Sequence, residues 1–111
     1  MAVRPEPEEV PEGAAVVPLI PESAGISPLF LAVFHSLVFL DGSSEEIVDS
    51  AAAEEAVQYL ATYLQRLKPN DLRQLKDDLN RLADHARRQK WTPDQQELIR
   101  SFFKHYGIAE S

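Results

Sequence analysis

The chain has 111 residues and no cysteine. Its length suits one domain, and its composition excludes disulfides, thiolate metal sites and a cysteine nucleophile. The formal net charge is −7, so the long-range field of the protein disfavours nucleic acid and anionic membranes as partners. The first residues lack the pattern of a signal peptide, and no apolar run is long enough to span a bilayer. We therefore expect a soluble, cytoplasmic protein that binds neither nucleic acid nor membrane.

Residues 1–25 form an acidic tail that contains five of the eight prolines. Proline removes backbone donors and fixes φ, and few apolar residues offset the entropy of ordering. The tail is therefore expected to be disordered or extended, with residues 1–14 mobile. One apolar patch could dock in an extended form, and it comprises Val16, Val17, Leu19 and Ile20. The predicted helical domain covers residues 26–111.

A first helix is predicted from about residue 28 to residue 40. Ser27 suits the N-cap and Pro28 suits the first helical position, while Asp41-Gly42 suits the end of the helix. A buried strand through residues 37–40 is an alternative, because periodicity alone does not separate the two structures.

The second helical pattern follows directly and reaches residue 67. Ser43 and Glu46 have the spacing of a capping box, which predicts a helix start. The pattern breaks near Asp49-Ser50 if either of these residues caps a fresh helix.

Two more helices complete the domain. The third is predicted to start at Pro69, and the fourth starts at Thr92, where Gln95 has capping-box spacing, and ends at Gly107. Short connections make neighbouring helices antiparallel. The sequence therefore predicts an all-α fold, a small four-helix antiparallel bundle, or a five-helix bundle if the second helix breaks. The residues expected to form its core are Leu60, Leu64, Leu75, Leu79, Leu82, Ile99 and Phe102.

The first helix is apolar on two faces, whereas a surface helix of a small bundle usually has one apolar stripe. Its second face carries Leu31, Val38 and Phe39. Either the helix is central in the bundle, or this face is covered by the tail patch, by a second copy of the chain or by a partner protein. The predicted partner-binding residues are Leu31, His35, Val38, Phe39, Val16, Val17, Leu19 and Ile20.

No catalytic, cofactor or metal site is predicted. None of the three histidines follows a glutamate at the spacing of a carboxylate-bridged metal site, and no glycine-rich phosphate loop is present. His35 could act as a general base or as a pH switch. A core histidine bonded to the backbone is the favoured interpretation, because no catalytic partner can be placed beside it. We therefore expect no enzymatic activity and no cofactor.

Charge is distributed unevenly along the chain. Residues 1–65 hold 11 acidic groups and one basic group, so a basic partner would be attracted to this half. The densest acidic cluster indicates either helix capping and solubility or an acidic docking surface, and it consists of Glu45, Glu46, Asp49, Glu54 and Glu55. The third helix mixes basic residues with acids, which is typical of a solvated face, and its acids are Asp71, Asp77, Asp78 and Asp84.

These features favour a non-enzymatic protein–protein interaction module, an adaptor or regulatory subunit that binds a protein partner or a second copy of itself. An alternative is a small acidic inhibitor of a basic protein, of the immunity or antitoxin kind. In size and charge the chain is similar to bacterial immunity proteins, which is a likeness of composition without a shared motif. The third alternative is an enzyme that uses His35 with a carboxylate.

Overall fold

The computed structural model describes residues 11–109, and the secondary structure in this range is entirely helical. The elements are the 3-10 helix η2 (Glu22–Ala24) and the α-helices α1 (Pro28–Gly42), α2 (Ser50–Leu64), α3 (Pro69–Arg88), α4 (Pro93–Arg100) and α5 (Phe102–His105). The all-α prediction is confirmed, and residues 37–40 belong to a helix rather than to the alternative strand. Within the described range, no helix combines the length and the apolar character needed to cross a membrane.

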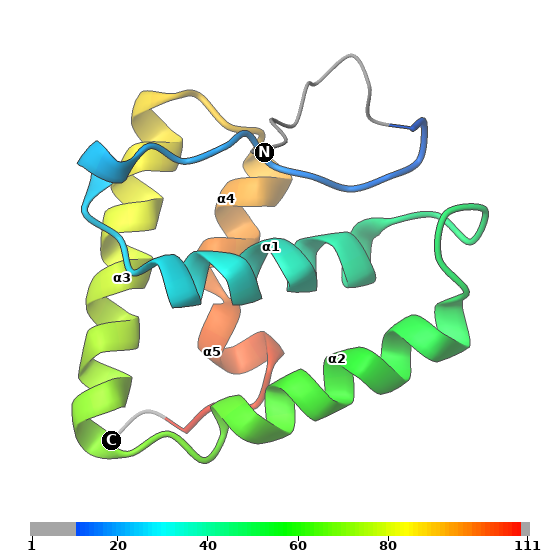
Figure 1. Ribbon diagram of the computed structural model, residues 1–111. Helices are drawn as coiled ribbons and strands as arrows, with labels where there is room; N and C mark the ends of the chain where they lie inside the picture. Colours follow the sequence, from blue (N-terminus) through cyan, green and yellow to red (C-terminus); the bar gives the residue numbers. More distant parts are fainter. Residues whose placement is uncertain (1–10, 110–111) are drawn as a thin grey trace, which may run out of the picture.

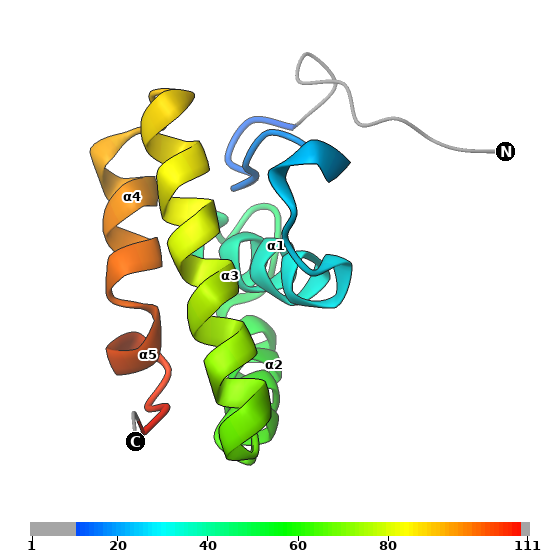
Figure 2. The same cartoon turned by 90° about the vertical axis from the view of Figure 1, so that its left-hand side faces the viewer.

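The helices form two antiparallel pairs that lie across one another. The helices of one pair, α1 and α2, run in opposite directions, and α3 is paired in the same way with α4, which leads into α5 (Figure 1). The turned view shows α1 nearly end-on beside the upright α3 and α4 (Figure 2). The bundle is therefore a layered one, in which α1 and α2 lie on one side of α3, α4 and α5.

Helix α2 begins at Ser50, directly after Asp49, which is where the sequence allowed the second helical pattern to break. The Asp49 Oδ2 atom accepts a hydrogen bond from the Ala52 backbone N at 2.9 Å and caps α2. The capping box expected from Ser43 and Glu46 is wrong, since residues 43–49 contain turns and no helix. The Ser43 Oγ instead accepts a hydrogen bond from the Ala15 backbone N at 2.9 Å, so this side chain anchors the tail rather than a helix.

The predicted fourth helix has its expected start and end, but the structure divides it into two helices, α4 and α5, a division that was not predicted from the sequence. Thr92 and Gln95 bond each other's backbone N at 3.1 and 3.0 Å, which completes the capping box of α4. The helical stretch is interrupted at Ser101, which separates α5 from α4. Gly107 has φ 68°, and the Ile108 backbone N donates to the Phe103 carbonyl at 2.8 Å. This left-handed turn ends the helix in the way that a C-terminal glycine usually does.

The core lies where α1 crosses the second pair. Phe34 and Phe102 are each 1% exposed, and Leu37 and Leu82 are fully buried. The Phe102 ring lies 5.8 Å from Phe30 and 6.3 Å from Phe34, between ring centroids. Most of the predicted core is confirmed, because the buried residues include Leu75, Leu79, Leu82, Ile99 and Phe102. The exceptions are Leu60 and Leu64, which are only half-buried.

Asp78 corrects the interpretation of α3 as a helix whose acids are all solvated. Its side chain is 1% exposed, and its Oδ1 accepts hydrogen bonds from the Ser27 backbone N at 3.2 Å and from the Gln74 side chain at 3.1 Å. Ser27 occupies the N-cap of α1, but its own side chain makes no capping bond. A carboxylate from α3 therefore satisfies the backbone at the start of α1, as buried polar groups require.

The tail prediction falls partly outside the described residues, which begin at residue 11. From there the chain has largely extended backbone and runs along α1 before the short turn η2 (Figure 1). Val17 and Ile20 are 6% and 8% exposed and belong to the main core. The Gly13 carbonyl accepts a hydrogen bond from Ser44 N at 2.9 Å. Burial of two apolar side chains and these backbone bonds offset the ordering entropy of this part.

Candidate functional site

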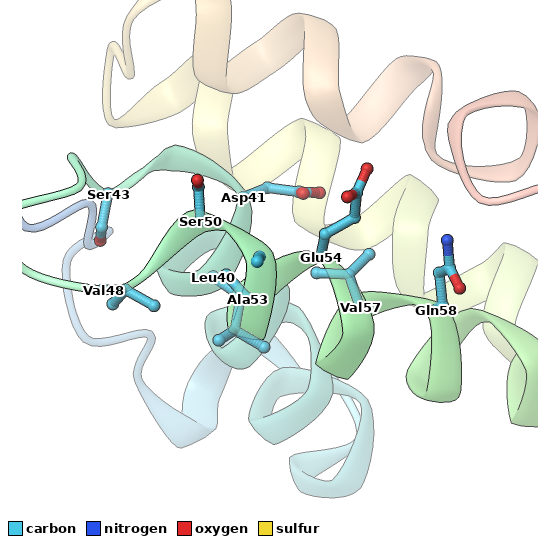
Figure 3. A pocket seen from close by; sticks show the side chains of 10 residues that line it. Leu40, Asp41, Ser43, Val48, Ser50, Ala53, Glu54, Val57 and Gln58 are labelled. Atoms are coloured by element: carbon cyan, nitrogen blue, oxygen red, sulfur yellow. The ribbon is translucent and has the colours of Figure 1, made fainter.

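An open groove lies between the C-terminal end of α1 and the N-terminal half of α2, and its volume is about 650 Å³ (Figure 3). The turns of residues 43–49 close one end of it. The connection between α1 and α2 beside the groove contains no helix. Its lining residues are Leu40, Asp41, Ser43, Val48, Ser50, Ala51, Ala53, Glu54, Val57 and Gln58.

The lining combines an apolar wall with acidic groups. Leu40, Val48 and Val57 supply apolar surface, while Asp41 and Glu54 supply carboxylates from the two facing helices. Figure 3 shows the side chains of Asp41 and Glu54 extending to the same side of the groove. This composition suits a ligand that presents both apolar and positively charged groups.

Asp41 is held in place by two residues at the C-terminal end of the chain. The Tyr106 hydroxyl donates to Asp41 Oδ2 at 2.7 Å, and His105 Nε2 lies 3.4 Å from the same oxygen. Burial, followed by the hydrogen bond and the charge of Asp41, raises the pKa of Tyr106 far above its usual range. Tyr106 therefore remains a donor at physiological pH. Both contacts involve Oδ2, so the other carboxylate oxygen, Oδ1, takes no part in them.

Glu54 differs from Asp41 because no described residue forms a hydrogen bond or an ion pair with its carboxylate. Glu54 is exposed, and no lysine, arginine or histidine lines the groove. Nearby, Glu45 accepts a hydrogen bond from the Ser50 hydroxyl at 2.5 Å, which adds a further negative charge at the closed end.

The dipoles of the two helix ends do not change the sign of the charge in the groove. The C-terminal end of α1 contributes roughly half a negative charge, and the N-terminal end of α2 contributes roughly half a positive charge. These two contributions largely offset each other. The full charges of Asp41, Glu54, Glu45 and Asp49 then leave the groove and its closed end negative.

Two of the partner-binding residues predicted on α1 belong to the main core or pack against it. Val38 is 9% exposed and buried in the main core, and Leu31 packs against that core. Gly42 faces Ala15 so closely that a Cβ at Gly42 would lie 2.8 Å from the Ala15 Cβ. The chain's own tail thus lies against the C-terminal end of α1.

The remaining predicted residues divide between buried and exposed positions. In the tail, Val17 and Ile20 face inward, whereas Val16 is 47% exposed and Leu19 is 71% exposed. On α1, Phe39 is half-buried. The structure therefore brings Val17, Ile20 and Val38 into one core but leaves Val16 and Leu19 on the surface.

His35 is half-buried and lies beside an aromatic ring. Its ring centroid is 6.3 Å from that of Phe34, with the two planes nearly perpendicular. Burial lowers the pKa of His35 below its ordinary value of 6.5. Within residues 11–109, no group of three or more histidine, aspartate or glutamate side chains is arranged to hold a metal ion.

The groove was not recognised as a site from the sequence. Its signals were present separately, because Glu54 belongs to the acidic cluster and Leu40 belongs to the apolar first helix. Their proximity depends on the angle at which α1 and α2 diverge, which local sequence does not determine. Comparisons of the chain with protein-family models, curated proteins and solved structures find no match. The site is therefore defined by geometry alone.

Proposed function

We propose that this protein is a non-enzymatic protein–protein interaction module, an adaptor or regulatory subunit, and that the groove between α1 and α2 receives its partner. The observation that carries the proposal is the groove itself. It has a volume of about 650 Å³, and its lining includes both apolar and acidic residues. Ligand sites typically occupy about 300–1,000 Å³. The groove is open to solvent, which suits side chains from a protein surface better than an enclosed small molecule.

The surroundings of the groove agree with a binding role. Only Ala53 is buried among the residues of α2, and α2 makes most of its helix contacts with α1. A helix held on one side can present its other surfaces to a partner without loss of the core. Cytoplasmic location, inferred from the cysteine-free composition, is part of the same proposal.

A second surface for the same function is the outer side of the tail. Leu19 is 71% exposed and Val16 is 47% exposed, while Val17 and Ile20 anchor the segment from beneath. Leu19 also borders a smaller cavity of about 230 Å³ between the tail and the end of α3, which Trp91 and His85 help to line. Exposed apolar side chains on an anchored segment can act as contacts for a partner.

Two neighbouring alanines on α2 allow a matched test of the groove. Ala51 and Ala52 are both exposed, but only Ala51 lines the groove. Immobilised wild-type protein, Ala51→Trp and Ala52→Trp are exposed to an extract of the host cell, and the retained proteins are compared by mass spectrometry. We expect a partner that the wild type and Ala52→Trp retain and that Ala51→Trp loses, because the indole occupies the groove.

Circular dichroism and thermal melting establish that both variants keep the fold. The same extract is tested with Leu19→Ser, which removes the most exposed side chain of the second surface. Equal retention by Ala51→Trp and the wild type would contradict the groove as the binding surface. Loss of the partner with Leu19→Ser alone would assign binding to the tail.

A further inference from the structure

Building on the proposed interaction function, we infer that the partner of the groove is a cationic segment that inserts an arginine or lysine side chain between Asp41 and Glu54. The apolar stem of that side chain, together with its apolar neighbours, would lie on the wall formed by Leu40, Val48 and Val57. Arginine and lysine combine an apolar stem with a charged head, so they match both parts of this lining.

Charge complementarity selects this occupant. The lining contains two carboxylates and no basic residue, and residues 1–65 contain only Arg4 as a basic group against 11 acids. An acidic or phosphorylated segment would place like charges together, which costs free energy. A purely apolar segment would desolvate Asp41 and Glu54 without giving them partners.

The two carboxylates are prepared for a cation in different ways. Asp41 is already fixed by Tyr106 at 2.7 Å, so little side-chain freedom is lost when Asp41 binds. Glu54 has no partner among the described residues and is free to turn toward an incoming cation. A guanidinium group can bond two carboxylates at once because its donors form a planar fork.

Two smaller cavities in the described part of the chain do not offer this combination. The cavity between α3 and α4 is lined by Lys76 and Arg100 rather than by acids. The cavity below the tail has prolines, Leu19 and Trp91 but no carboxylate. Of these three cavities, the groove between α1 and α2 is therefore the one that suits a cationic segment.

A pair of synthetic peptides tests the inference with the full-length protein. One is an acetylated and amidated amphipathic peptide of leucine, arginine and alanine, and the other replaces each arginine by citrulline, which has a similar shape but no charge. Binding is measured by titration calorimetry at low and high salt, and the binding surface is mapped by backbone amide NMR shifts.

Neighbouring glutamates on α2 supply the matched variants. Glu54 lines the groove, whereas Glu55 is exposed beside it and does not. We expect the arginine peptide to shift the amides of Leu40, Glu54 and Val57 and to bind about tenfold more tightly than the citrulline peptide. Glu54→Gln should weaken binding about two- to fivefold, as the loss of an exposed ion pair does, while Glu55→Gln should leave it unchanged.

Three results would overturn the inference. Equal affinity of the two peptides would mean that charge does not select the occupant, while the groove would remain a docking surface. Equal weakening by Glu54→Gln and Glu55→Gln would assign the attraction to the general acidic field. Amide shifts that avoid the groove would place the cation elsewhere. The proposed role of the groove as the partner-binding surface is tested separately, since that role fails if Ala51→Trp retains the partner as well as the wild type does.

Discussion

The third helix of this protein has a far more polar sequence than the second helix, yet it supplies more of the buried core. Five residues of α3 are buried, namely Leu75, Asp78, Leu79, Leu82 and Ala86, whereas only Ala53 is buried in α2. The apolar residues of α3 meet α1, α4 and α5 in the main core, while α2 lies against α1 and borders an open groove. Stability is therefore concentrated in one region and accessible surface in the other.

The exposure of the tyrosines shows the same contrast between α2 and the core. Tyr59 and Tyr63 are 61% and 62% exposed, and the guanidinium of Arg66 lies 5.2 Å from the Tyr63 ring centroid. Tyr106, by comparison, is 4% exposed and bonds to Asp41. A helix that leaves two aromatic rings in solvent contributes less to the core than its apolar content indicates.

Truncation of one leucine in each helix should show the largest difference. Leu82→Ala removes a fully buried side chain and should destabilise the protein by about 2–5 kcal/mol. Leu60→Ala removes a half-buried side chain and should cost roughly 1 kcal/mol. Urea denaturation followed by circular dichroism measures both values. Equal losses would show that α2 contributes to the core as much as α3 does.

A smaller effect is expected from the buried carboxylate of α3. Asp78→Ala leaves the backbone N of Ser27 without its acceptor and should cost about 1–3 kcal/mol, the penalty for an unsatisfied buried group. The exposed neighbour Asp77 provides the control, and Asp77→Ala should change stability by less than about 0.5 kcal/mol. The same denaturation experiment measures both, and similar losses for the two variants would contradict the role of Asp78 as a cap for α1.

The parts of the fold that could be predicted from sequence are those encoded locally. The start of α4 at Thr92 and the end of the last helix at Gly107 each depend on residues within one turn, and both are confirmed. The break before Ser50 also depends on a local cap, Asp49. By contrast, Ser43 has a local capping pattern, but a distant bond from Ala15 takes its hydroxyl.

The candidate site was less predictable because it depends on contacts between distant segments. Asp78 and Ser27 are 51 positions apart, and Tyr106 and Asp41 are 65 positions apart. No periodic pattern in one helix reports such pairs. The sequence does indicate that the first helix needs cover on a second face, and the structure places Val17 and Ile20 in the core that includes part of that face.

The smallest expected effect concerns His35 of α1, which is half-buried. Burial lowers its pKa below the ordinary value of 6.5, so the unfolded chain binds a proton more readily than the folded chain. As pH falls below 6.5, proton uptake therefore favours the unfolded state, and the free energy of unfolding decreases. His35→Gln should remove this contribution and flatten the pH dependence between about pH 7.5 and 5, where histidine titrates. Denaturation curves at several pH values measure the difference in the free energy of unfolding between the two proteins. The acidic residues are the same in both proteins, so their contributions cancel in this difference. An NMR titration that gives His35 a pKa at or above 6.5 would contradict the burial effect.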